Sequence, residues 1–357
     1  MDLLQSFVVR YRHPTTLHIA LSSSTCIDVE GWVVLMVKSK ASITRYAVDL
    51  FRLQGVDHEW YLYSMRDERD MMHVCCNLCG ADDKELLFEK DGFRHVRCRH
   101  CRLIYVSPRL SDHFGQQEVF WSKQGARLPD FERMGAQDYR RSRRKALLAE
   151  VAVYREYRKT GYIMDIGCGF GGFLKAAKEQ GWEHPVGIEI APQAAHYTSR
   201  FFPVKRDITE EGPHRKGLFD VIRLHNVIEH LSDPKKMVHS VHEFLRVGGL
   251  LVVSTPNFDS ISVAMCGSDA RYIGGDDHVY LFTPETLCRL LEEAGFRMVA
   301  IETKGVHLTP KDHNGKLRSY FWKHLSNGGI TYAERLLDLF IRHTRKGDRL
   351  TILAEKR

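Results

Sequence analysis

A short apolar run that ends in a cluster of glycines constrains this chain more than any other feature. Residues 162–166 are apolar except for Asp165, and they lead into Gly-Cys-Gly-Phe-Gly-Gly at positions 167–172. Glycines at this spacing let the backbone turn sharply and approach a ligand closely between a strand and a helix. The pattern predicts the first strand, loop and helix of an α/β nucleotide-binding fold.

The alternation of apolar and helical stretches continues toward the C-terminus. Residues 283–294 have the pattern of an amphipathic helix, with Pro284 in the first turn and Gly295 just beyond the end. Alternation of this kind predicts a Rossmann-like, doubly wound parallel sheet with helices on both faces. We expect its further strands in the apolar runs at 185–190, 203–205, 219–224, 250–254, 298–302 and 349–354.

At 357 residues the chain can form one α/β core and have about a hundred residues left over, so we expect several parts. One interpretation of residues 1–70 is that they are not native, because Met65, Met71 and Met72 are alternative start positions. The remaining parts are predicted to be a cysteine-rich module at 71–110, a helical connector at 111–160, and the α/β domain at 161–357 with a helical insertion at about 304–346.

Hydrophobicity and charge exclude some classes of protein. The most apolar early stretch, residues 17–37, is interrupted by Asp28 and Glu30, so we expect no membrane insertion. The N-terminus lacks the basic and apolar pattern of a secretory signal, which favours a cytoplasmic protein. A net charge of +7 is mild for this length and is compatible with an anionic small molecule as partner.

Two Cys-x-x-Cys pairs predict a metal site ahead of the α/β domain. Five of the nine cysteines fall between Cys75 and Cys101, and in a reducing compartment such a cluster favours metal ligation. Eighteen residues separate the pairs, enough for a β-hairpin that brings both around one tetrahedral zinc ion. Four thiolates leave no open coordination position, so the expected zinc is structural. We therefore predict that residues 71–110 form a zinc ribbon whose ligands are Cys76, Cys79, Cys98 and Cys101.

Acidic side chains beside the glycine loop distinguish between cofactors. Asp165 lies two residues before the first glycine, where it would repel the pyrophosphate of a nicotinamide or flavin dinucleotide. S-adenosylmethionine instead presents an ammonium group and a positive sulfur there. Glu189, twenty-four residues later, is placed to bind ribose hydroxyls, and Asp207 follows the expected third strand, where it can meet the adenine amino group.

Several motifs follow one another along this part of the chain. They are Asp-Ile-Gly-Cys-Gly-Phe-Gly at 165–171, Gly-Ile-Glu at 187–189, Phe-Asp-Val-Ile-Arg-Leu-His-Asn-Val-Ile-Glu-His-Leu-Ser-Asp-Pro at 219–234, Gly-Gly-Leu at 248–250, Pro-Asn at 256–257, Tyr-Leu-Phe-Thr-Pro-Glu at 280–285 and Gly-Phe at 295–296. Their composition and order resemble those of class I S-adenosylmethionine-dependent methyltransferases. The resemblance covers about 137–303, and it implies methyl transfer from S-adenosylmethionine, with Asn226 or His225 beside the methionine portion of the cofactor. The loop residues at the cofactor would be Gly167, Cys168, Gly169 and Gly171.

Three side chains are candidates for catalysis at the methyl acceptor. Glu229 and His230 follow the fourth strand, at the carboxyl edge of the sheet, and His278 lies in the loop after the fifth strand. Histidine has the pKa of a general base near neutral pH, and the sequence leaves open whether His230 or His278 is that base. In sugar C-methyltransferases that carry an N-terminal zinc module, a Glu-His pair near this position is linked to catalysis, but the tyrosine that precedes the pair in those enzymes is absent here.

The ribbon, followed by Ile-Tyr-Val-Ser-Pro at 104–108, resembles the N-terminal module of bacterial methyltransferases that modify sugars and other small metabolites. We therefore expect methylation of an oxygen or carbon of a small molecule, with a sugar or polysaccharide precursor, nucleotide-linked, as the first hypothesis. One alternative is an RNA methyltransferase that contacts nucleic acid through the ribbon, although no Asn/Asp-Pro-Pro-Tyr follows the fourth strand. Another alternative is a non-catalytic zinc-ribbon adaptor.

Overall fold

The computed structural model describes residues 7–12, 26–29, 32–37, 71–111, 140–158, 161–275, 277–306, 339–341 and 343–357. The chain divides into two compact units, Met1–Glu68 and Arg69–Arg357. In the first unit, β1 (Phe7–Arg12), β2 (Cys26–Val29) and β3 (Trp32–Val37) form an antiparallel sheet in the order β1-β3-β2. Among the described helices, none has the length and apolar character needed to cross a membrane.

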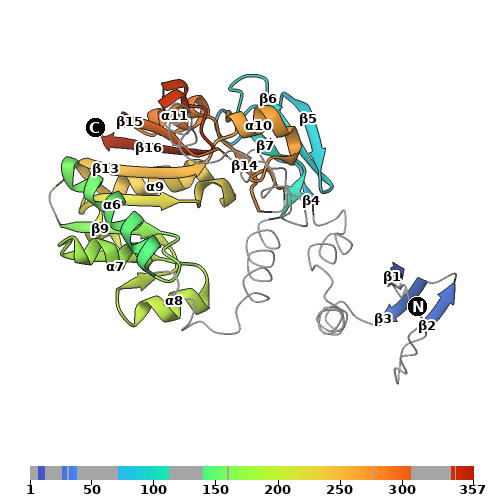
Figure 1. Ribbon diagram of the computed structural model, residues 1–357, viewed down its shortest axis with the longest axis horizontal. Coiled ribbons are helices and arrows are strands. Elements are labelled where there is room, and N and C mark those ends of the chain that lie inside the picture. Colours follow the sequence, from blue (N-terminus) through green and yellow to red (C-terminus); the bar gives the residue numbers. More distant parts are fainter. Residues whose placement is uncertain are drawn as a thin grey trace, which may run out of the picture. The chain divides into compact units, whose positions relative to one another are not determined.

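A seven-stranded sheet forms the centre of the second unit (Figure 1). Its order is β11-β10-β9-β12-β13-β16-β15; the first five strands run parallel, and β16 runs antiparallel to both of its neighbours. This confirms the predicted doubly wound, Rossmann-like sheet. The strands are β9 (Tyr162–Ile166), β10 (His184–Ile188), β11 (Val204–Lys205), β12 (Phe219–His225), β13 (Leu245–Pro256), β15 (Phe296–Lys304) and β16 (Arg349–Lys356).

Alternate residues of the strands supply the two faces of this sheet. Ile163 and Val221 pack with α6 (Arg141–Tyr157) and α7 (Gly172–Glu179) in one apolar cluster. Their neighbours Met164 and Ile222 pack with α9 (Pro234–Phe244) and α11 (Pro284–Glu293) in another. The remaining helical elements are α8 (Pro192–Ser199), α10 (Ile261–Cys266), η3 (Ile208–Glu211), η4 (Pro213–Arg215), η5 (Ile228–His230) and η6 (Gly267–Asp269).

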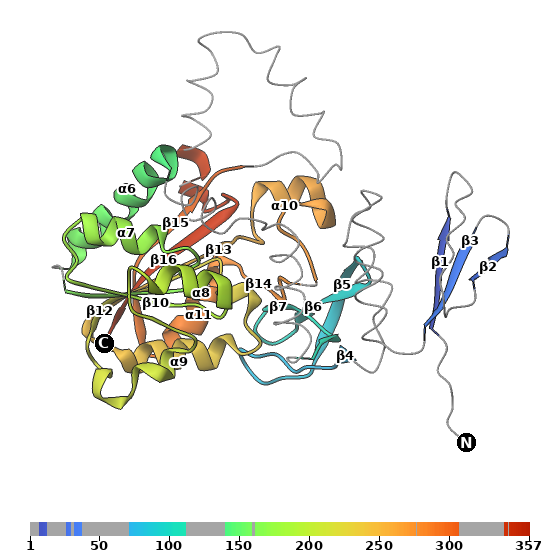
Figure 2. The same cartoon turned by 90° about the horizontal axis from the view of Figure 1, so that it is seen from below.

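The cysteine-rich segment folds as a small antiparallel sheet that is completed by the α/β domain. β5 (Lys84–Lys90), β6 (Phe93–Cys98) and β7 (Ile104–Val106) pair in sequence, and β14 (Tyr280–Leu281) adds a fourth strand beside β7 (Figure 2). β4 (Met71–Met72) pairs separately with β8 (Arg109–Leu110). Buried ribbon residues belong to the same apolar cluster as the α9 face of the large sheet, so the two parts share a core.

Some predicted segments differ from the structure or lie outside the residues that it describes. The strand predicted at 250–254 is longer in the structure, where β13 covers Leu245–Pro256. Residues 250–256 pair with β16, and β12 pairs with residues 250–254 and, before a register shift, with Leu245. Most of the predicted connector at 111–160 and of the predicted insertion at 304–346 lies outside the described residues.

Candidate active site

A cavity of about 690 Å³ opens at the carboxyl ends of β9, β10 and β12. Its size is in the range of small-molecule sites, and it lies where the strand order of a doubly wound sheet reverses. Gly171, Glu229 and His278 are not among its described lining residues. The residues predicted from sequence that do line it are Asp165, Gly167, Cys168, Gly169, Glu189, Asp207, His225, Asn226 and His230.

Backbone conformation explains the glycines of the loop between β9 and α7. Gly167 and Gly169 have φ angles of 75° and 53°, in the left-handed region that side chains rarely adopt. A Cβ atom at Gly167 would lie 2.5 Å from Val227 Cγ2, and the N–H groups of Gly167 and Cys168 both donate to the Ile188 carbonyl. The loop therefore lies tightly against β10, with its backbone forming part of the cavity wall.

Asp165 is buried in an ion-pair network that the sequence analysis did not foresee. The Arg223 guanidinium donates to Asp165 Oδ1 at 2.8 Å and, through Nε, to Glu150 Oε1 on α6 at 2.7 Å. It also lies 4.3 Å from the centre of the Phe173 ring. An arginine inside the otherwise apolar interior of β12 was the one sequence signal for this network.

Burial raises the pKa of Asp165 to about 6, although Arg223 opposes the shift. Burial also acts to raise the pKa of Glu150, but the charge of Arg223 outweighs it and lowers that pKa to about 2. With both carboxylates ionised, the network carries one net negative charge beside the cavity. Such a charge attracts an ammonium or sulfonium group and repels a pyrophosphate.

The ends of β10 and β11 place two further carboxylates at the cavity. Glu189 accepts the Gly169 N–H at 2.8 Å and the Ala191 N–H at 2.7 Å, one on each oxygen. These bonds fix the carboxylate and leave lone pairs for further donors such as ribose hydroxyls. Asp207 caps η3 by accepting the Thr209 N–H at 2.8 Å and is exposed.

The end of β12 contributes a neutral imidazole and a constrained amide. Burial, followed by the charge of Arg223, lowers the pKa of His225 to about 3, so this ring is uncharged near neutral pH. Asn226 has a φ angle of 53°, and its N–H donates to the Ser254 carbonyl at 2.8 Å. This left-handed turn ends the strand and sends the chain toward Glu229 and His230.

The three predicted catalytic side chains lie together. The His230 and His278 rings are 4.7 Å apart between centroids, and Glu229 Oε1 is 3.9 Å from His230 Nε2. Each imidazole has Nδ1 2.8 Å from a backbone carbonyl, that of Asp277 for His230 and that of Tyr272 for His278. A carbonyl can only accept, so Nδ1 carries the proton in both rings and Nε2 keeps a lone pair when the ring is neutral.

Glu229 is buried, with Oε2 accepting from the Thr255 hydroxyl at 2.9 Å. Its other oxygen has no hydrogen-bond partner among the described residues. One ligating atom from each of Glu229, His230 and His278 lies within 4.8 Å of the others. The cluster can therefore accept a proton and stabilise the resulting imidazolium, and its atoms are also compatible with a bound cation.

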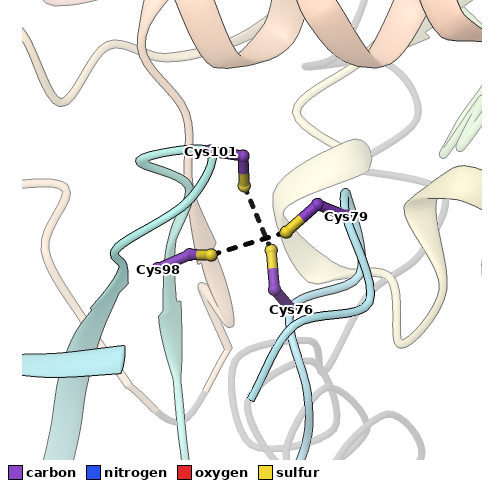
Figure 3. A group of neighbouring side chains, drawn as sticks. All are labelled: Cys76, Cys79, Cys98 and Cys101. Carbon is purple, nitrogen blue, oxygen red and sulfur yellow. Dashed lines mark hydrogen bonds between the residues drawn. The ribbon is translucent and has the colours of Figure 1, made fainter. Parts of the chain in front are cut away.

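The four predicted zinc ligands converge with their sulfur atoms facing one another (Figure 3). The Sγ atoms of Cys76 and Cys101 are 3.3 Å apart, and those of Cys79 and Cys98 are 3.5 Å apart. A tetrahedron with Zn–S bonds of about 2.3 Å requires roughly 3.8 Å between sulfurs, so a small adjustment admits the ion. Burial raises the pKa of the Cys76 and Cys101 thiols, and a bound cation would supply the charge that thiolates need there. Cys75, exposed, lies outside the group.

Residues 138–301 match a family model described as a methyltransferase domain. This region is a class I S-adenosylmethionine-dependent methyltransferase domain. The glycine loop and the carboxylates at the strand ends that line the cavity belong to this region.

The methyltransferase is similar to proteins described as ubiquinone biosynthesis O-methyltransferases. One from Aeromonas salmonicida is 27% identical over 170 residues, which cover 43% of this chain and 70% of that protein. One from Ruegeria pomeroyi is 32% identical over 161 residues, which cover 42% and 64% respectively. The chain thus spans about two thirds of the length of these relatives. A crystal structure of a methyltransferase from Archaeoglobus fulgidus aligns with 64% of this chain and 100% of its own, at 24% identity and a TM-score of 0.43.

Proposed function

We propose that this protein transfers a methyl group from S-adenosylmethionine to an oxygen atom of a small molecule. The observation that carries the proposal is the net negative Glu150–Arg223–Asp165 network beside the glycine loop of a methyltransferase domain. The names of the similar O-methyltransferases favour oxygen over carbon as the acceptor atom.

Bound S-adenosylmethionine supplies an electrophilic methyl group. Asp165 attracts its ammonium group, Glu189 accepts hydrogen bonds from its ribose, and Asp207 lies where the adenine amino group would be. The protein then has to align the acceptor hydroxyl with the methyl group and accept its proton.

The His230 and His278 pair is suited to accept that proton. Their Nδ1–H groups are held by backbone carbonyls, which fixes both rings and leaves each Nε2 atom as the base. We assign the base to His230, because it lines the cavity and lies beside the Glu229 oxygen that has no hydrogen-bond partner among the described residues. Once His230 is protonated, that carboxylate stabilises the new positive charge.

We further propose that Cys76, Cys79, Cys98 and Cys101 bind a structural zinc ion, and that the acceptor is a hydroxylated metabolite such as a nucleotide-linked sugar. The resemblance of the ribbon to that of sugar methyltransferases supports the sugar. The RNA alternative is supported less well, because arginines of the ribbon are compensated locally: Arg94 by Glu89, Arg97 by Glu85 and Arg99 by Asp83.

The test is a calorimetric titration of the zinc-loaded protein with S-adenosylmethionine, beside the Asp165→Asn variant. This substitution removes the charge but keeps an oxygen that can accept from Arg223, so it limits structural damage. Micromolar binding that the variant loses would support the proposal and justify mass-spectrometric screening of nucleotide sugars and phenols for methylation. No binding by the folded, zinc-loaded protein would overturn it and favour the non-catalytic adaptor.

A further inference from the structure

The first Cys-x-x-Cys turn makes three hydrogen bonds to the start of α9: two go through the Asn77 side chain, and in the third Lys235 Nζ donates to the Leu78 carbonyl at 3.0 Å. Asn77, between Cys76 and Cys79, donates through Nδ2 to Asp233 Oδ1 at 2.9 Å. Its Oδ1 atom accepts the backbone N–H of Lys235 at 3.0 Å. The first N–H groups of a helix have no partner within the helix, so the ribbon supplies one of the missing acceptors. Asp233 supplies another, because it accepts the Lys236 N–H at 2.9 Å.

Arg109, at the other end of the ribbon, binds the segment that leads into α9. Its guanidinium donates to the Ser232 carbonyl at 2.9 Å and to the Tyr280 hydroxyl at 3.3 Å. The Tyr280 hydroxyl in turn donates to the Ser232 carbonyl at 3.2 Å. Arg109 and Tyr280 are buried, so these bonds are shielded from water. We call residues 229–233 the acceptor loop; it contains Glu229 and His230.

A third connection runs through the shared sheet. The Val106 N–H donates to the Val279 carbonyl at 3.0 Å, and the Val279 N–H donates to the Glu229 carbonyl at 2.9 Å. Val279 directly follows His278. The ribbon strand, the segment of His278 and the acceptor loop are therefore linked by consecutive backbone hydrogen bonds.

The cofactor side of the cavity has a different support. Its loop is held by β10 and α8, through bonds such as that from Thr198 Oγ1 to the Gly169 carbonyl at 2.8 Å. Among the described residues, none of the ribbon lines the cavity. The ribbon therefore acts on the cavity through its neighbours: the acceptor loop, the His278 segment and the start of α9, where Lys236 and Met237 line the cavity.

We propose that Asn77 is a positioning residue through which the zinc-bound ribbon fixes the acceptor loop, and thereby His230, without taking part in cofactor binding. An asparagine suits this role because its amide donates to Asp233 and accepts from Lys235 at once. An alanine loses both bonds. An aspartate loses the donor and places a carboxylate against Asp233.

The role of His230 as a base rests on the proposed methyl transfer. The test of whether Asn77 fixes the position of His230 needs no methyl acceptor. Hydrogen exchange of the full-length, zinc-loaded protein would be measured by mass spectrometry, with and without S-adenosylmethionine, for wild type, Asn77→Ala and Cys75→Ala. The NMR signal of the His230 ring, assigned with His230→Gln, gives a second readout. Zinc content and affinity for S-adenosylmethionine are measured on the same samples.

For Asn77→Ala we expect about tenfold faster exchange in peptides covering 229–237 and a displaced His230 signal. Zinc content should be unchanged, affinity for S-adenosylmethionine should stay within about twofold, and peptides covering 162–190 should exchange as in wild type. Cys75→Ala should match wild type in every readout, because Cys75 is exposed and outside the four-sulfur group.

The double variant Asn77→Asp with Asp233→Asn provides the rescue. It reverses donor and acceptor between the two side chains while the new aspartate still accepts from Lys235, so both protection and the His230 signal should return. Wild-type exchange and an unmoved His230 signal in Asn77→Ala would overturn the inference, as would lost zinc or faster exchange throughout the sheet. Absent binding of S-adenosylmethionine by wild type would instead count against the proposed function.

Discussion

The two sides of the cavity, the proposed cofactor side and the proposed acceptor side, are built in different ways. The cofactor side comes mostly from one continuous stretch, β9 through α8. Within it, the Gly169 N–H of the glycine loop donates to the Glu189 carboxylate. The acceptor side joins the end of β12, Thr255 of β13, the segment around His278 and two ends of the ribbon. The cofactor side should therefore tolerate damage to the ribbon, whereas the acceptor side should not.

Removal of zinc should have the largest effect, and it should distinguish the two sides of the cavity. Buried ribbon residues such as Leu103 and Tyr105 share a core with the large sheet, so loss of the ion should lower the melting temperature by at least about 10 °C. Calorimetry after chelation would measure this. Retention of S-adenosylmethionine binding below the transition would support the division, and its complete loss would contradict it. Cys75→Ser should keep both metal and stability.

Substitution of the proposed base should affect turnover alone. His230→Gln should lower kcat for an acceptor found by the screen by about 10²- to 10⁴-fold, because proton transfer loses its acceptor, while affinity for S-adenosylmethionine stays unchanged. His278→Gln is the matched variant and should lower kcat less. A larger loss in His278→Gln would transfer the assignment to that residue.

Removal of the charge of Asp165 should affect the cofactor side of the cavity. Asp165→Asn should weaken binding of S-adenosylmethionine by about a hundredfold, because the ammonium group loses its buried counter-charge. Asp207→Asn is the control within the same cavity and, being exposed, should cost less than about tenfold. Equal losses in the two variants would show that burial of the charge is not what decides the affinity.

The smallest effect should be a pH dependence confined to the cofactor side. Burial raises the pKa of Asp165 to about 6, so the carboxylate is ionised above this pH and protonated below it. A cationic ligand prefers the ionised form, so affinity should fall by up to about tenfold per pH unit below 6 and level off above it. Binding below pH 6 should release a proton, measurable by titration in buffers of different ionisation enthalpy. Asp165→Asn should flatten this profile.

The sequence allowed prediction of features that depend on local spacing. The bounds of β9 agree with the prediction, and the two Cys-x-x-Cys pairs meet as expected, because each depends on a few consecutive residues. The position of Glu229 and His230 after β12 followed from the parallel order of the sheet.

Features that depend on pairing between distant segments were missed. The Arg223–Glu150 pair joins β12 to α6, and the bonds of Asn77 join the ribbon to α9. Polar side chains at such positions have many alternative partners in an unfolded chain, so spacing does not select one. The addition of β14 to the ribbon sheet was unforeseen for a related reason, because two residues are too few to show a strand period.

The pairing of β14 with β7 also bears on folding during synthesis. The ribbon is synthesised well before Tyr280–Leu281, so β7 leaves the ribosome with one edge unpaired and remains so until most of the large sheet has been made. A shortened chain limited to residues 138–301, the span of the family match, would lack β16 between β13 and β15 of the large sheet. It would also leave β14 without its partner and an apolar face without its cover. The span that identifies the enzyme is therefore shorter than the unit that folds.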